Sequence, residues 1–241
     1  MALQPETRPR HRIVDKPAIL RSHWLFGKLD PRAIERLSAC MLSRTVKRGT
    51  TIFAKGDEST SLFAIGAGTV KIGVPSADGR DAVFNLLEAG DIFGEIALLD
   101  GHPRTADASA VTDCELFTIE RREFLPLVAS NPEIAQKLIE MLCARLRHTS
   151  EQVEDILFLN LPMRLAKTLL RMTERTTEGP AKIAITQRDL GQMIGMSRES
   201  TNKQLREWED KKWLRIERGG IVLLSRNALA RIASFEGDEW H

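Results

Sequence analysis

Short apolar runs separated by turn residues dominate the chain between about Leu42 and Phe124. The runs recur at roughly 8 to 12 residue intervals, which is typical of an all-β sandwich or barrel. They lie at residues 51–53, 62–65, 69–72, 82–84 and 116–119, and most of the segments between them contain Gly and Asp. The pair Asp78-Gly79 separates two of the runs and predicts a β-hairpin turn there. This part of the chain is therefore predicted to form a β-roll.

Helical spacing flanks the predicted roll on both sides. Before it, Asp30 is a candidate N-cap for a helix that begins with Pro31. After it, Asn131 is a candidate N-cap, Pro132 suits the first turn, and no Pro or Gly follows until after Phe158. A helix of about 25 residues is roughly 38 Å long, which is more than one small roll needs for its cover.

An apolar stripe on this long helix mixes steps of three and four residues. Its members are Leu138, Leu142, Leu146, Thr149, Val153 and Ile156. Such a stripe favours a parallel pair of helices at a homodimer interface, formed by the second half of the helix. The alternative is a helix that folds back over its own domain.

The last third of the chain has the pattern of a winged helix-turn-helix. Asn160-Leu161-Pro162 interrupts the helical spacing and predicts a hinge, followed by a helix from Met163 to about Arg175. Thr186 is a candidate cap for the next helix, which ends at Gly195, and Ser197 is a candidate cap for the helix after that. A hairpin is predicted at Arg218-Gly219-Gly220 and would form the wing.

The helix that follows Ser197 has an apolar face and a polar face. Thr201, Leu205 and Trp208 share the face predicted to lie in the core. The other face carries Arg198, Glu199, Asn202, Lys203 and Arg206, which are residue types that read base edges in the major groove. Ser197 and Arg188 complete the predicted DNA-binding set, with Arg188 assigned to phosphate. An ordinary solvated helix face is the alternative.

Composition narrows the class of protein. The chain has 241 residues, 42% of them hydrophobic and 28% charged, which suits two modest domains. Residues 160–241 carry 15 basic and 11 acidic side chains, so the slight basic excess lies beside the predicted DNA-binding helix. No apolar run is long enough for a membrane span, and the first 12 residues have no signal-peptide core, so a cytoplasmic protein without membrane contact is expected.

The cysteine pattern argues against a disulfide framework and against a metal site. Cys40, Cys114 and Cys143 are odd in number and widely separated, with no C-x-x-C spacing. All three are interpreted as small core residues. No metal ligands are therefore assigned.

The stretch from Gly90 to Ala106 has the chemistry of an anion site. A Gly-rich turn that opens a short helix offers free backbone N–H groups, and Arg104 offers a planar donor suited to phosphate. Glu95 would not suit an anion alone, but it could accept a hydrogen bond from a ribose hydroxyl. An alternative is an enzyme in which Glu95 and Arg104 form a catalytic pair with His102. No nucleophile–base motif accompanies them, so no catalytic residues are assigned.

Three motifs together resemble the Crp/Fnr superfamily of transcription regulators, and especially its cyclic-AMP-responsive branch. They are the segment from Phe93-Gly94-Glu95 to Arg104-Thr105-Ala106, then Arg147-His148-Thr149-Ser150-Glu151, and finally residues 194–200. The resemblance implies an α+β fold with an N-terminal cyclic-nucleotide-binding β-roll (jelly roll), a long dimerisation helix and a C-terminal winged helix-turn-helix. The implied domains are an N-terminal extension (1–22), a nucleotide-binding domain (23–130), a dimerisation helix (131–159) and a DNA-binding domain (160–241).

The same resemblance implies the ligand and its binding residues. Cyclic AMP would be held at Gly94, Glu95, Ile96, Arg104, Thr105 and Ala106, with Glu95 on the 2′-hydroxyl. Thr149 and Ser150 would contact the adenine, the serine reaching in from the other subunit. Thr105 stands where cyclic-AMP-binding members have serine, so cyclic GMP is a second expected ligand.

The function predicted from these features is a cyclic-nucleotide-dependent, homodimeric transcription regulator, expected to be an activator, rather than an enzyme. The resemblance implies a palindromic TGTGA-like DNA site and RNA polymerase as partners, although Lys203 replaces an arginine of the family at one base. Ligand binding would extend or reregister the helix near residues 153–159, and the hinge would then place both reading helices. The alternatives are a Crp/Fnr-type regulator of another small effector, a constitutive DNA binder with a vestigial nucleotide site, and a nucleotide effector that binds no DNA.

Overall fold

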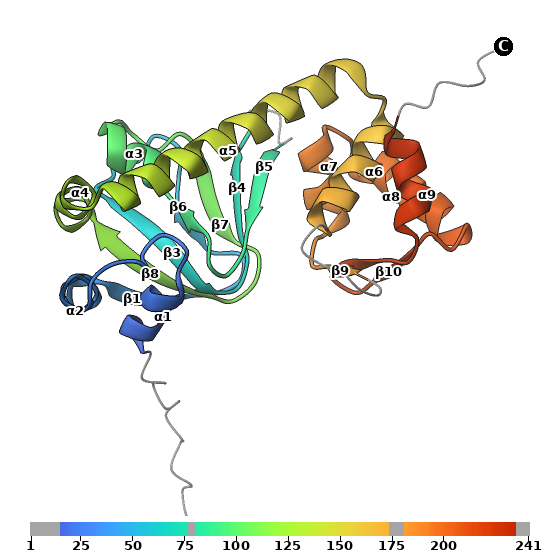
Figure 1. Cartoon of the computed structure of the whole chain (residues 1–241). Helices are drawn as coiled ribbons and strands as arrows, with labels where there is room; N and C mark the ends of the chain where they lie inside the picture. The colour runs from blue at the N-terminus through green and yellow to red at the C-terminus, as the bar shows by residue number, and fades with distance from the viewer. Residues whose placement is uncertain (1–14, 77–80, 174–180, 235–241) are drawn as a thin grey trace, which may run out of the picture.

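A computed structural model describes residues 15–76, 81–173 and 181–234 of the chain. A β-roll and a smaller, mostly helical domain lie toward opposite ends of one long helix (Figure 1). The two domains are the α+β arrangement that the sequence predicts.

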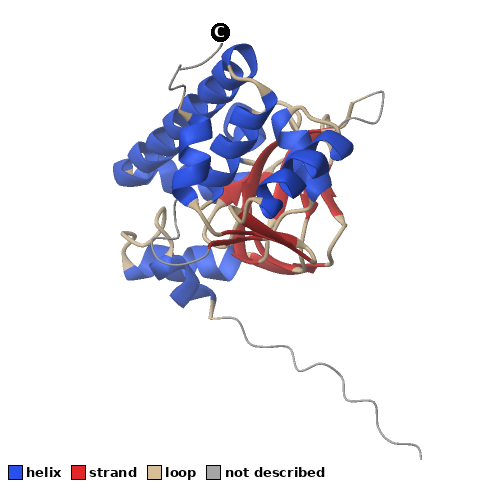
Figure 2. Ribbon diagram, turned by 90° about the vertical axis from the view of Figure 1, so that its right-hand side faces the viewer, coloured by secondary structure: helices blue, strands red, loops and turns tan. Residues whose placement is uncertain are grey.

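Two four-stranded antiparallel sheets form the roll. The strand order is β1-β8-β3-β6 in the first sheet and β2-β7-β4-β5 in the second. The bounds are β1 Leu42–Val46, β2 Thr51–Phe53, β3 Ser61–Ala67, β4 Val70–Val74, β5 Ala82–Leu87, β6 Ile92–Phe93, β7 Asp107–Ala110 and β8 Cys114–Glu120. Side chains between the sheets form a core that includes Val70, Phe93, Ala108 and Leu116. The strands and the helices packed against them are visible side-on in Figure 2.

Strands β4 and β5 pair antiparallel, as the predicted hairpin requires. Val74 lies opposite Ala82 at the end of the ladder. The turn residues Asp78 and Gly79 themselves lie outside the described residues.

Helices cover the first sheet of the roll. They are α1 (Lys16–Ser22), α2 (Pro31–Cys40), α4 (Arg121–Ser130) and the first turns of α5 (Pro132–Phe158). Their core includes Leu20, which lies within the predicted N-terminal extension, and Phe124. Asp30 caps α2 as predicted, since its carboxylate accepts from the N–H of Ala33 at 2.9 Å.

The long helix α5 runs for 27 residues, close to the predicted length. Asn131 stands at its N-cap but does not cap it with its side chain. Instead the Asn131 amide donates to the carbonyl of Leu127 at 2.8 Å, in the preceding helix. The position was therefore predicted correctly and the hydrogen bond was not.

Side-chain burial confirms part of the sequence analysis and corrects its assignment of two cysteines. In the predicted stripe, Leu138 is only 3% exposed and packs in the core of its own domain, so only the later part of the stripe is left exposed. Cys114 is buried as expected, but Cys40 and Cys143 are exposed on helices and are not core residues.

The C-terminal domain is a helical bundle with a three-stranded sheet, ordered β10-β11-β9. Its elements are α6 (Leu161–Met172), β9 (Ala181–Ile183), α7 (Gln187–Ile194), α8 (Arg198–Asp210), β10 (Leu214–Glu217), β11 (Gly220–Leu223) and α9 (Arg226–Ala233). Asn160 at the predicted hinge caps α6 by accepting from the N–H of Met163. Helix α6 therefore begins at Leu161, two residues earlier than predicted. Within the described ranges, no helix is both long and apolar enough to cross a membrane.

Candidate nucleotide and DNA sites

The turn at Gly94 joins β6 to the short helix α3 (Glu95–Asp100). Gly94 has φ 80°, in the left-handed region that residues with a Cβ rarely adopt. A Cβ at this position would also lie 2.4 Å from Nη1 of Arg104. Glycine is therefore required for two reasons: the backbone is left-handed, and Arg104 leaves no room for a side chain.

Arg104 is buried across this turn, with 5% of its surface exposed. Its Nη1 donates to the carbonyl of Gly94 at 2.7 Å, and its Nη2 donates to the carbonyl of Ser61 at 2.8 Å. The guanidinium also lies 4.1 Å from the ring centroid of Phe53, within cation–π range. Burial lowers the pKa of Arg104, while the charges of Glu95 and Asp57 oppose that shift. The side chain is thus a positive charge already removed from water.

Glu95, at the start of α3, is 1% exposed and forms an ion pair with Arg145 of α5. Arg145 also donates to the carbonyl of Ile92 at 2.5 Å. Sequence reasoning did not identify Arg145. The available signal was its position four residues before Thr149, which places both on one face of α5.

These residues fit an anionic ligand that also carries hydroxyl groups. The first N–H groups of α3 have no intrahelical partner, and Nε of Arg104 is buried without one among the described residues. Ala106 is buried and Gly94 partly buried, whereas Thr105 and Ile96 are exposed. Arg104 contacts Gly94, and Glu95 follows Gly94 in the chain, so the three residues lie together. A small cyclic phosphodiester could be held by the N–H groups and Arg104, with a hydroxyl on Glu95.

Thr149 and Ser150 lie on α5, one turn beyond Arg145. Both side chains are exposed, and each hydroxyl donates to a carbonyl four residues earlier, those of Arg145 and Leu146, at 3.0 Å. Neither of these two hydrogen bonds reaches the Gly94 turn. Their hydroxyls can rotate toward a partner, since a bond to the preceding turn is local.

An exposed apolar seam runs along the same helix. Ile139, Leu146 and Val153 are spaced by seven residues and are 52 to 68% exposed. Leu142, Thr149 and Ile156 follow each of them by three residues, which completes the a and d positions of a heptad repeat. Ile139 thus takes the place that the sequence analysis gave to Leu138.

The helix-turn-helix has the predicted caps and turn. Thr186 accepts from the N–H of Asp189 at 3.0 Å, and Ser197 accepts from the N–H of Ser200 at 3.1 Å. Gly195 ends α7 with φ 70°, the left-handed conformation expected of a tight turn. The predicted wing is formed by β10 and β11, which pair antiparallel on either side of Arg218 and Gly219.

The two faces of α8 separate as predicted. Thr201, Leu205 and Trp208 are at most 1% exposed and lie in the domain core. Arg198, Glu199, Lys203 and Arg206 are exposed on the other side, Asn202 is partly buried, and Ser197 and Arg188 are also exposed. Three of these exposed side chains, Arg198, Lys203 and Arg206, are basic, and basic side chains on one outward face of a helix suit contact with a polyanion.

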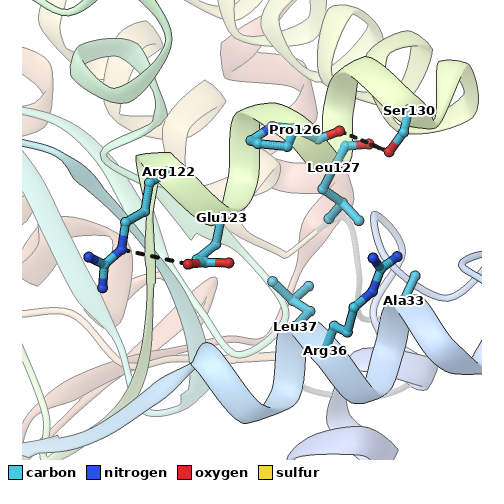
Figure 3. A pocket seen from close by; sticks show the side chains of 8 residues that line it. All are labelled: Ala33, Arg36, Leu37, Arg122, Glu123, Pro126, Leu127 and Ser130. Atoms are coloured by element: carbon cyan, nitrogen blue, oxygen red, sulfur yellow. Dashed lines mark hydrogen bonds and ion pairs between the residues drawn. The ribbon is translucent and has the colours of Figure 1, made fainter.

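A separate pocket lies between α2 and α4, away from both sites. Figure 3 shows its lining, which combines apolar side chains with Arg36, Arg122 and Glu123. Ala33, Leu37, Pro126, Leu127 and Ser130 complete it. No lining residue comes from the Gly94 turn or from α5.

Comparison with known proteins identifies the two domains. Residues 43–131 match the family model "Cyclic nucleotide-binding domain", and residues 163–232 match "Crp-like helix-turn-helix domain". The chain is 34% identical over 220 residues to the CRP-like cAMP-activated global transcriptional regulator of Mycobacterium tuberculosis, covering 89% of this chain and 98% of that protein. It is 35% identical to the cAMP-activated global transcriptional regulator CRP of Pasteurella multocida, over 76% of this chain and 90% of the relative.

A solved structure supports the same fold. FixK2 from Bradyrhizobium japonicum superposes with a TM-score of 0.73 at 21% identity, covering 82% of this chain and 99% of FixK2. With a cyclic-nucleotide-binding roll, a Crp-like helix-turn-helix and this similarity to curated regulators over most of its length, the chain belongs to the Crp/Fnr superfamily of transcription regulators.

Proposed function

We propose that this regulator is a homodimer that binds cyclic AMP in its β-roll and then binds a palindromic DNA site through its two α8 helices. The observation that carries the proposal is the Gly94 turn, where Glu95 and Arg104 are both buried and Arg145 of α5 contacts Glu95. The relatives from Mycobacterium tuberculosis and Pasteurella multocida are both named as cAMP-activated.

The donor set of the roll supports a cyclic nucleotide. Arg104 and the free N–H groups of α3 would neutralise the phosphate, and Ala106 would add another N–H. Glu95 would accept from the ribose hydroxyl. Glu95 is already paired with Arg145 of α5. A hydroxyl that bonds to Glu95 would therefore act directly on a contact of α5. In this proposal Ile96 and Thr105 border the ligand at the exposed side of the turn.

The seam on α5 supports dimerisation. Exposing three apolar side chains at heptad spacing to water costs free energy. A parallel copy of the same helix would cover them, because its apolar residues have the same spacing. Thr149 and Ser150 lie on or beside this seam, so a base bound there would contact both helices. A ligand held between two subunits favours one arrangement of the dimer over another, and that difference is the source of the allosteric effect.

The helix-turn-helix supports sequence-specific DNA binding. Arg198 and Lys203 can donate to guanine, and Glu199 can accept from cytosine, so the set suits a G·C-containing half-site such as TGTGA. Asn202 and Arg206 extend the same face, while Arg188 and Ser197 lie where phosphate contacts are expected. Activation of transcription would follow from contact between the bound dimer and RNA polymerase.

Calorimetry with three nucleotides tests the effector. Cyclic AMP should bind with measurable heat, while 5′-AMP, which lacks the cyclic diester, should bind at least about tenfold more weakly. Cyclic GMP is included because the exposed Thr105 hydroxyl could accept a hydrogen bond from the guanine amino group. Absence of heat with both cyclic nucleotides would overturn the nucleotide part of the proposal.

Fluorescence anisotropy with a palindromic duplex at fixed salt tests the regulatory step. Cyclic AMP should tighten specific binding without a comparable change in binding to a scrambled duplex, since non-specific affinity depends mainly on phosphate contacts. Arg198→Ala should reduce specific affinity by about tenfold or more, whereas Arg188→Ala should weaken both duplexes alike. DNA affinity that does not respond to the nucleotide would favour a constitutive binder.

A further inference from the structure

The first helix of the helix-turn-helix is docked on the β-roll. Helix α7 and strand β5 are in contact and face each other between the two domains (Figure 1). Leu86 of β5 packs against the core of the C-terminal domain. Gln192 of α7 donates to the carboxylate of Asp81, just before β5, at 3.3 Å.

One ion pair stands out in this contact. Nζ of Lys71 on β4 lies 2.8 Å from Oδ1 of Asp189 on α7, with the two side chains 25% and 12% exposed. Pairs on the protein surface contribute little, but this one is largely shielded from water, so its Coulomb attraction is less screened. The Thr186 hydroxyl donates to the other Asp189 oxygen at 2.6 Å, which holds the carboxylate in place.

Lys71 is on a strand that also reaches the nucleotide side of the roll. Its neighbours Val70 and Ile72 point into the core between the sheets. Strand β4 pairs with β7, where Lys71 lies opposite Ser109 and Gly73 lies opposite Asp107, the residue after Ala106. The same strand therefore contacts the segment that leaves the phosphate site and the helix that supports the reading head.

The docked position leaves the DNA-reading face open. Arg198, Lys203 and Arg206 of α8 are exposed while α7 rests on the roll. The contact therefore orients the DNA-binding domain without covering it. A second ion pair, Lys167 to Asp155 at 2.6 Å, joins α6 to α5 across the predicted hinge and also restricts the same domain.

We propose that Lys71 and Asp189 are positioning residues that hold the DNA-binding domain in the orientation that engages DNA. This inference rests on the proposed DNA-binding function. A dimer must present two reading helices at a fixed separation, and a domain that is already oriented loses less entropy on binding. The pair thus raises specific affinity without touching DNA.

Charge reversal tests the pair. Lys71→Glu places a carboxylate against Asp189 and should reduce affinity for the palindromic duplex by about tenfold at saturating cyclic AMP. Asp189→Lys should also reduce it, although an added positive charge near DNA would by itself strengthen binding. The swap Lys71→Glu/Asp189→Lys should bind more tightly than either single variant. Lys28→Glu, which changes the same charge at an exposed pair with Glu133, is the control and should bind like the unmodified chain.

Hydrogen exchange gives a readout that does not depend on DNA. Lys71→Glu should speed amide exchange in residues 82–87 and 187–194, and the swap should slow it again. Tighter DNA binding by Lys71→Glu would overturn the proposal, because the contact would then be inhibitory. A swap no better than the singles, or unchanged exchange in Lys71→Glu, would also overturn it. If the unmodified chain binds no specific duplex while exchange responds as expected, the proposed function fails and the docking contact stands.

Discussion

Gly94 combines a left-handed backbone with direct contact to the arginine of the candidate phosphate site. Gly49 shares that backbone, with φ 81°, but nothing lies within 4 Å of the Cβ that an alanine would add. The two glycines therefore separate the effect of backbone strain from the effect of displacing Arg104.

Gly94→Ala is expected to abolish most nucleotide binding. Both Gly94→Ala and Gly49→Ala should lose about 1 to 2 kcal/mol of unfolding free energy, because each forces a Cβ into the left-handed region. Only Gly94→Ala displaces the Arg104 guanidinium, so calorimetry should show at least about a tenfold loss of cyclic AMP affinity for this variant alone. Equal affinities in the two variants would contradict the assignment of Arg104 to phosphate.

His23 is a buried neutral histidine at the edge of the roll. It is 7% exposed, and its Nδ1 accepts from the N–H of Leu25 at 3.2 Å. Burial lowers its pKa to about 4, although the nearby charge of Asp91 acts in the opposite direction. The unfolded chain takes up a proton near pH 6.5, so the stability that the neutral form provides is present above that pH and is lost as the pH falls toward 4.

His23→Asn is therefore expected to reduce acid sensitivity. The unmodified chain should lose about 2 to 3 kcal/mol through this group between pH 7.5 and 4.5, and urea unfolding at both pH values measures that loss. Asparagine keeps a hydrogen-bond acceptor but does not titrate, so the variant should show a smaller difference. His102→Asn, at an exposed histidine, is the control and should keep the full difference. An unchanged pH dependence in His23→Asn would refute the argument.

At the scale of elements, α5 has two distinct faces. Leu138 and Ile134 lie in the core of the roll, and Arg145 contacts the Gly94 turn. A second face carries the exposed seam of Ile139, Leu146 and Val153. Because one helix carries both sets, the proposed dimer would allow a change at Glu95 to reach the seam without an intervening loop.

Leu146→Glu is expected to convert the dimer to a monomer. Leu146 is 68% exposed at the centre of the seam, and two glutamates would face each other across a parallel pair. Sedimentation velocity at micromolar concentration should show the mass of one chain, and circular dichroism should show that the fold is retained. Arg147→Glu, at the exposed neighbouring position outside the a and d set, should stay dimeric. A dimeric Leu146→Glu variant would show that the seam is not the interface.

At the scale of the whole molecule, the sequence predicted those interactions whose residues lie close together along the chain. The caps Asp30, Thr186 and Ser197 act within three residues, and the sequence predicted all three. The distinction between Leu138 and Ile139 was missed because adjacent apolar residues on a helix point to different neighbours, and only the packed fold shows which side the roll covers. Arg145 and Glu95 are separated by 50 residues, and Lys71 and Asp189 by 118, so no local spacing joins them.

The geometry of a two-fold dimer makes a last prediction about the DNA. If α5 pairs with its copy and each docked domain presents one α8, the two reading helices are held on the same side of the duplex, about one helical turn apart. Inserting five base pairs between the half-sites rotates one of them by about half a turn, so only one domain can bind at a time. Anisotropy should then give an affinity close to that of a duplex with a single half-site, lower by at least about tenfold than the intact palindrome. Equal affinity for the intact and the expanded site would mean that the two DNA-binding domains move independently, and neither the seam nor the docking of α7 on the roll would then fix their separation.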